Sequence, residues 1–119
     1  MADLIRQEIA ATATTLVVKV GTRVLTQADG KLDEDRIHNL AEQIHQVMET
    51  GRKVVLVSSG AVGAGMGRLG MKSRPADLAH LQAVAAVGQS VLIESYERAL
   101  HKHGRHAAQI LLTAEDMEN

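Results

Sequence analysis

Two short runs of apolar and β-branched residues predict the first strands of a buried sheet. Residues 14–20 read TTLVVKV and residues 53–59 read KVVLVSS. Neither run alternates strictly between apolar and polar positions, a pattern typical of parallel strands that helices cover on both faces. A third run, HAAQILL at residues 106–112, predicts another parallel strand.

Between the first two runs, apolar residues recur at the spacing of an amphipathic helix. Asp33 is placed to cap this helix, and Gly51 is placed to end it. The residues that share the apolar face are Ile37, Leu40, Ala41, Ile44, Val47 and Met48. A strand, a helix and a strand in this order predict a right-handed βαβ unit, and therefore an α/β fold.

The second half of the chain predicts one long helical stretch. Apolar and small residues follow a helical stripe from Pro75 to about His103, and Gly104 ends it. Because a helix of this length would span on the order of 40 Å, we expect a bend or a break, most readily near Gly88. Thr113 then begins a further helix as its N-cap.

Composition narrows the class of partner. The chain has 119 residues, a formal net charge of −1, no cysteine and a single aromatic residue, Tyr96. Positive and negative residues are balanced, so the sequence shows no basic surface that would bind nucleic acid or an anionic membrane. A single aromatic ring is also too few to stack against successive bases. The absence of cysteine excludes a disulfide scaffold and a thiolate metal site. With no long apolar span, we expect a single cytoplasmic domain that binds a small molecule.

Residues 60–70, GAVGAGMGRLG, follow the second strand and contain five glycines. We expect a flexible loop whose backbone N–H groups surround a phosphate or a carboxylate, because glycine allows positive φ and close approach. The GxGxxG match within it starts too far after the strand for a dinucleotide site, and the GK[ST] of a P-loop is missing. The alternative is a glycine-rich packing turn without a ligand.

Lys19 and a group of histidines are the other candidates for chemistry. Lys19 lies one residue before the end of the first strand, so its ammonium either faces a ligand crevice there or reaches the protein surface. The position of Lys19 in the sequence supports these two interpretations equally. His101, His103 and His106 lie near one another, but the helix dipole favours such residues at a helix end and no acidic ligand accompanies them. We therefore predict no metal site in this chain.

Four blocks of the sequence, in their order and spacing, resemble the glutamate 5-kinases of the amino acid kinase superfamily. The blocks are VVKVGTRVLT at 17–26, VLVSSGAVGAGMGRLG at 55–70, LQAVAAVGQ at 81–89 and QILLTAEDME at 109–118. The resemblance implies an αβα sandwich around a mainly parallel sheet, which agrees with the pattern described above. It also implies an enzyme that assembles as a homo-oligomer.

The activity that the resemblance implies is ATP-dependent phosphorylation of the γ-carboxylate of L-glutamate, the first step of proline synthesis, with Mg²⁺ accompanying the nucleotide. Lys19 matches the family lysine that contacts the ATP phosphates and stabilises the transferring phosphoryl group. Gly21 matches the glycine that lets backbone approach the phosphates, and Ser59 matches a serine that holds glutamate, with Gly60 beside it.

Kinase domains of this family are much longer than this chain. The resemblance therefore implies that residues 1–119 are the amino-terminal half of such a domain, without the carboxyl-terminal ATP-binding half, and that they are inactive alone. Two other readings stay open. The chain belongs to another amino acid kinase, or it is a non-catalytic module that binds an anion or serves assembly.

Overall fold

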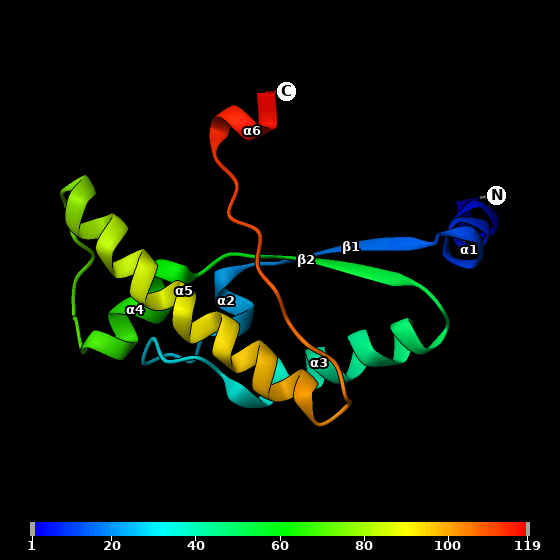
Figure 1. Cartoon of the computed structure of the whole chain (residues 1–119), viewed down its shortest axis with the longest axis horizontal. Helices are drawn as coiled ribbons and strands as arrows, with labels where there is room; N and C mark the ends of the chain where they lie inside the picture. The colour runs from blue at the N-terminus through cyan, green and yellow to red at the C-terminus, as the bar shows by residue number, and fades with distance from the viewer. Residues whose placement is uncertain (1, 119) are drawn as a thin grey trace.

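The computed structural model describes residues 2–118, which form an α/β fold of two parallel strands and six helices (Figure 1). In chain order the elements are α1 (Ala2–Thr12), β1 (Thr15–Val20), α2 (Thr22–Leu25), α3 (Glu34–Glu49), β2 (Lys53–Ser58), α4 (Ala61–Leu69), α5 (Leu78–His101) and α6 (Ala114–Glu118). The α/β class and the first two strands predicted from the sequence are confirmed.

The elements β1, α3 and β2 form a βαβ unit. The two strands pair in parallel, with Thr15 opposite Lys53 and Val20 opposite Ser58. Asp33 caps α3 by accepting a hydrogen bond from the Arg36 N–H at 3.2 Å, as predicted. Parallel pairing brings the carboxyl ends of both strands to the same edge of the sheet, which is where ligands bind in open α/β folds.

The helices α3, α4 and α5 cover one face of the strands, and the other face is open (Figure 1). Val17 is 68% exposed and Val55 is 50% exposed, so the prediction that both faces are covered is wrong for the described residues. Apolar side chains on both faces of a strand indicate two covering layers, but they cannot say whether the same stretch of chain supplies both. The core lies on the covered face and includes Val20, Leu25, Ile37, Ala41, Ala64, Leu92, Tyr96, Ala99 and Leu100.

The glycine-rich stretch folds as a helix, α4, and not as the flexible loop that the sequence suggested. Its small residues allow α4 to pack tightly on α5, and this packing stabilises a helix that glycine would weaken in isolation. Helix α4 begins after Gly60, whose φ is +102°, and ends at Gly70, whose φ is +67°. Both values are in the left-handed region that favours glycine.

Helix α5 runs unbroken from Leu78 to His101, so the predicted break near Gly88 is absent. Gly88 sits where α5 crosses α4, and a Cβ atom at this position would lie 1.6 Å from the carbonyl oxygen of Ala61. This glycine therefore serves close helix packing and not bending. Although α5 is the longest helix within residues 2–118, none of the helices there has the length and apolar character to cross a membrane.

The third strand predicted at residues 106–112 is not formed. The segment is extended, but it pairs with neither β1 nor β2, and it leads past the strands to α6 (Figure 1). Ile110 is 84% exposed. A strand needs a neighbour for its backbone N–H and C=O groups, and the apolar run that indicates a strand does not supply that neighbour. Thr113 caps α6 as predicted, since its Oγ1 accepts from the Asp116 N–H at 3.3 Å.

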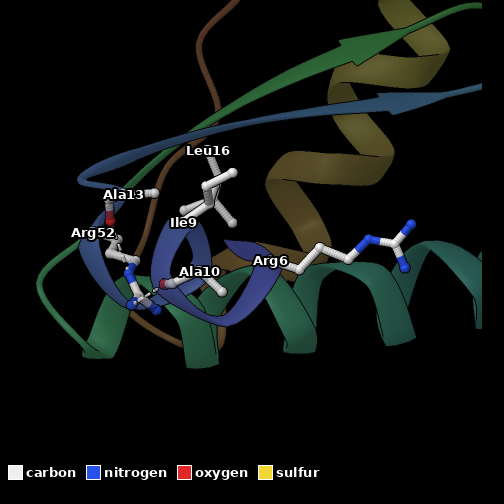
Figure 2. Close-up of a pocket in the computed structure, with 6 residues that line it drawn as sticks. All are labelled: Arg6, Ile9, Ala10, Ala13, Leu16 and Arg52. Carbon is white, nitrogen blue, oxygen red and sulfur yellow. Dashed lines mark hydrogen bonds between the residues drawn. The ribbon is translucent and has the colours of Figure 1, made fainter. Parts of the chain in front are cut away.

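Arg52 fastens α1 to the βαβ unit. Its Nε donates to the Ala13 carbonyl at 3.0 Å, and its guanidinium also donates to the Ala10 carbonyl at 2.6 Å (Figure 2). These carbonyls lie at the carboxyl end of α1, where a cation satisfies unpaired oxygens and opposes the helix dipole. Beside this contact is an apolar hollow of about 310 Å³, lined also by Ile9 and Leu16.

We expect Arg52→Ala to raise amide hydrogen exchange in α1 roughly tenfold, because hydrogen bonds from a charged donor contribute about 1.5 kcal/mol. The core should keep its protection, since Arg52 does not belong to it. The matched control is Arg6→Ala, because Arg6 lines the same hollow but directs its guanidinium away from Arg52 (Figure 2). Equal exchange in the two variants would contradict this role of Arg52. Hydrogen exchange with mass spectrometry measures the difference.

Candidate functional site

The carboxyl ends of β1 and β2 bring the candidate residues together. Lys19 lies opposite Val57 and Val20 lies opposite Ser58, so Gly21 and Ser59 follow at the same edge. Helix α2 begins directly after Gly21, and α4 begins directly after Gly60. Two helix starts therefore follow the carboxyl edge of the sheet, which is the edge where ligands bind in open α/β folds.

Hydroxyl groups connect the two strand ends. The Ser59 N–H donates to the Val20 carbonyl at 3.1 Å, and the Ser59 Oγ donates to the same oxygen at 3.3 Å. The Thr22 Oγ1 lies 3.4 Å from the Ser59 Oγ. Thr22 is therefore part of the candidate site, a role that the sequence pattern did not predict. The sequence feature that could have indicated this role is the position of Thr22 directly after Gly21.

Gly60 shapes the entry to α4. Its positive φ turns the chain from β2 into the helix, and a Cβ atom there would lie 3.3 Å from the Thr22 methyl group. No side chain caps α4. The first helical hydrogen bond runs from the Ala64 N–H to the Gly60 carbonyl at 2.9 Å, so the N–H groups of residues 61–63 precede it. Unpaired N–H groups at a helix start are the groups that bind phosphate and carboxylate.

Lys19 projects on the open face of the sheet, near its carboxyl edge. It is exposed, as are Thr15 and Val17 on the same face of β1. The apolar pattern predicts this lysine in a strand buried on both faces, and the exposed face of β1 shows that this prediction is wrong. Within residues 2–118 the Lys19 ammonium makes no hydrogen bond or ion pair. Its charge is thus available to an anion from outside the described residues.

Tyr96 contacts the end of β2 from the covered side of the sheet. It lies on α5, it is buried, and its hydroxyl is 3.1 Å from the Ser58 Oγ at the end of β2. Burial raises the pKa of the Tyr96 phenol above its ordinary value of 10.0, while the hydrogen bond with Ser58 opposes the shift. The Ser58 Oγ contacts the Tyr96 hydroxyl and the Ser59 Oγ contacts Val20 and Thr22, so the adjacent serines have different contacts. No local pattern in the sequence pairs Tyr96 with Ser58.

The raised pKa of Tyr96 makes stability depend on alkaline pH. A phenol is neutral when protonated, so burial favours the protonated form of Tyr96 in the folded chain. The stabilisation that results is complete below the unfolded pKa near 10, and it is lost as pH rises through the higher folded pKa. We expect the free energy of unfolding to fall over that range, and the tyrosinate absorbance of the folded chain to appear above pH 10. Tyr96 is the single aromatic residue, so the absorbance reports it alone. Titration at the unfolded pKa, or an equal loss of stability in Tyr96→Phe, would contradict this prediction.

Other glycines of the 60–70 stretch serve packing. A Cβ atom at Gly65 would lie 1.9 Å from the Val84 carbonyl oxygen on α5, and one at Gly67 would lie 3.0 Å from the Gly30 carbonyl oxygen. For these two positions the packing alternative raised by the sequence is therefore the correct one. A hollow of about 350 Å³ beside α4 is lined by residues that include Lys31, Gly67 and Arg68, and by none of the candidate residues.

The site has the chemistry to bind an anion. Lys19, Gly21, Thr22, Ser59 and Gly60 offer an ammonium, hydroxyl groups and backbone amides, and none of these five residues has a carboxylate. Such donors suit a phosphate or a carboxylate, whereas protein sites for Mg²⁺ usually include at least one carboxylate. These five residues therefore fit an anion such as a phosphate or a carboxylate, and they offer a metal ion no charged ligand.

Comparison with known proteins connects this geometry with a family. The model of the amino acid kinase family matches residues 14–119. A glutamate 5-kinase of Rhodopirellula baltica is 57% identical over 113 residues, which cover 95% of this chain and 29% of that protein. A glutamate 5-kinase of Bifidobacterium longum is 54% identical over 94% of this chain and 29% of its own length. One from Thermoanaerobacter sp. is 46% identical over 87% of this chain and 28% of its own. The chain thus spans less than a third of the curated relatives that it matches.

Proposed function

Because this chain belongs to the amino acid kinase family, we propose that it carries part of the active site of a glutamate 5-kinase, which phosphorylates the γ-carboxylate of L-glutamate with ATP. The observation that carries the proposal is the meeting of Lys19, Gly21, Ser59 and Gly60 at one edge of a parallel sheet. The names of the relatives support glutamate as the acceptor. We further propose a cytoplasmic enzyme of proline synthesis that assembles as a homo-oligomer.

The proposed reaction needs no general base. A glutamate side chain with a pKa near 4.3 is ionised at neutral pH, so its γ-carboxylate oxygen can attack the γ-phosphorus directly. A bond from that oxygen to phosphorus forms while the bond between phosphorus and the β,γ-bridging oxygen breaks, and ADP leaves with the electron pair. The products are glutamyl 5-phosphate and ADP. Positioning and charge stabilisation then account for catalysis.

Each candidate residue has a part in this chemistry. The Lys19 ammonium stabilises the negative charge that spreads over the phosphoryl oxygens during transfer. The backbone at Gly21 leaves space for the phosphates, since nothing lies within 4 Å of a Cβ atom built there. The Ser59 hydroxyl and the N–H groups that follow Gly60 hold the glutamate substrate. Thr22 fixes the position of the Ser59 hydroxyl.

We propose that residues 1–119 form the amino-terminal half of the kinase domain and are inactive without the ATP-binding half. The relatives are more than three times as long as the region matched here, which supports this proposal. The test is glutamate-dependent release of ADP from ATP with Mg²⁺, measured on this chain and on a version lengthened to the full length of the relatives. Activity in the longer version alone supports both proposals. A folded longer version without activity contradicts the kinase and favours a non-catalytic module that binds an anion.

A further inference from the structure

A second group of chemically active side chains lies at the carboxyl end of α5. Glu97, His101 and His106 each offer one potential metal ligand atom, and these atoms lie within 4.8 Å of one another. The group was not predicted from the sequence, which placed the histidines together but found no acidic partner for them. Its existence does not depend on the proposed kinase activity.

The chain reversal after α5 builds this group. Glu97 and His101 are four residues apart on α5, so they share one face of its last turns. The chain then turns at Gly104, whose φ is +70°, and the Arg105 N–H donates back to the Leu100 carbonyl at 3.2 Å. This turn returns His106 to the side of Glu97. His103, by contrast, stacks on His45 at a ring distance of 4.2 Å and does not take part.

Two contacts hold Glu97 against the segment that follows α5. Its Oε1 lies 2.7 Å from the His106 Nδ1, and its Oε2 accepts a hydrogen bond from the Ala107 N–H at 2.5 Å. The second oxygen of the Glu97 carboxylate is oriented by the backbone, in the way that supporting contacts orient metal ligands.

We propose that Glu97, His101 and His106 bind a divalent transition metal ion of the zinc type. Two imidazoles and one carboxylate form a donor set that zinc accepts, with a remaining position for water. Ligand atoms around tetrahedral zinc lie about 3.3 Å apart when the bonds are about 2.0 Å long. The side chains therefore have to approach one another from their present spacing. His101 and His106 are both exposed, and His106 contacts Glu97 through its Nδ1. The metal replaces the direct contact between Glu97 and His106.

The competing role for Glu97 is purely structural, as a clamp on the segment after α5. A clamp requires Glu97 and the Ala107 N–H, whereas a metal site also requires His101, which makes no hydrogen bond with Glu97 or His106. His101 therefore distinguishes the two roles. Its replacement should leave the clamp intact and should remove one of the three metal ligands.

The test is titration of the tag-free, metal-free chain with Zn²⁺ by isothermal calorimetry, with circular dichroism to verify folding. We expect one Zn²⁺ per chain, and at least tenfold weaker binding in both His101→Ala and His106→Ala. The matched control is His80→Ala, which removes an exposed histidine paired with Asp77 at the other end of α5 and should not alter binding. Two results would overturn the proposal. One is a folded chain that binds no stoichiometric Zn²⁺, and the other is binding that His101→Ala and His80→Ala leave equally strong.

Discussion

Replacement of Lys19 by alanine is expected to lower the rate of glutamate phosphorylation by about 10²–10³-fold in a version of full family length. Lys19 is exposed at the carboxyl edge of the sheet, next to the start of α2. Within residues 2–118 no ion pair competes for its ammonium, so the charge is available to the transferring phosphoryl group. The effect should fall mainly on kcat, because charge on the phosphoryl oxygens develops in the transition state.

A lysine on the same face provides the control. Lys53 projects on the open face of the sheet, but it begins β2 and lies opposite Thr15, at the end of the strands away from the candidate site. Lys53→Ala removes an equal charge and should leave the kinetics within about twofold, since exposed charges far from a site act weakly at physiological salt. Lys19→Arg should recover only part of the rate, because guanidinium and ammonium differ in shape. Equal rates for the two alanine variants would exclude Lys19 from the chemistry.

Local signals predicted the βαβ unit correctly. The strand residues of β1 and β2, the Asp33 cap and the helical spacing within α3 are all encoded within a few residues of where they act. Lys19 and Ser59 lie at one edge because parallel strands joined by a helix must end on the same side. The kinase assignment itself came from four sequence blocks together, and the family match is consistent with it.

Features that depend on distant partners could not be predicted in this way. Residues 106–112 have the composition of a strand but lack a neighbour to pair with in the described residues. The contacts of Ser58 with Tyr96, and of Glu97 with His106, join positions whose meeting depends on how α5 packs and where the chain turns back. The glycines of α4 were read as a ligand loop because a glycine for helix packing and a glycine for anion binding look alike in one sequence.

Substitution of Gly88 by alanine is the largest expected loss of stability. In an isolated helix the added methyl group would stabilise by up to about 1 kcal/mol. Here a Cβ atom would lie 1.6 Å from the Ala61 carbonyl oxygen and 2.6 Å from the Gly65 backbone nitrogen, so α4 and α5 must separate. Overpacking against backbone costs on the order of 3 kcal/mol, which is a large part of the total stability of a small domain. Urea unfolding followed by circular dichroism measures the loss.

The matched control for this substitution adds the same methyl group where space is open. Gly21 has a φ of −77°, which any residue adopts, and nothing lies within 4 Å of a Cβ atom there. Gly21→Ala should therefore leave the urea midpoint unchanged or raise it slightly, by reducing the freedom of the unfolded chain. If Gly88→Ala were as stable as Gly21→Ala, the close crossing of α4 and α5 would be wrong. Because Gly60 and the start of α4 belong to the candidate site, separation of these helices should also weaken binding of anions at the strand ends.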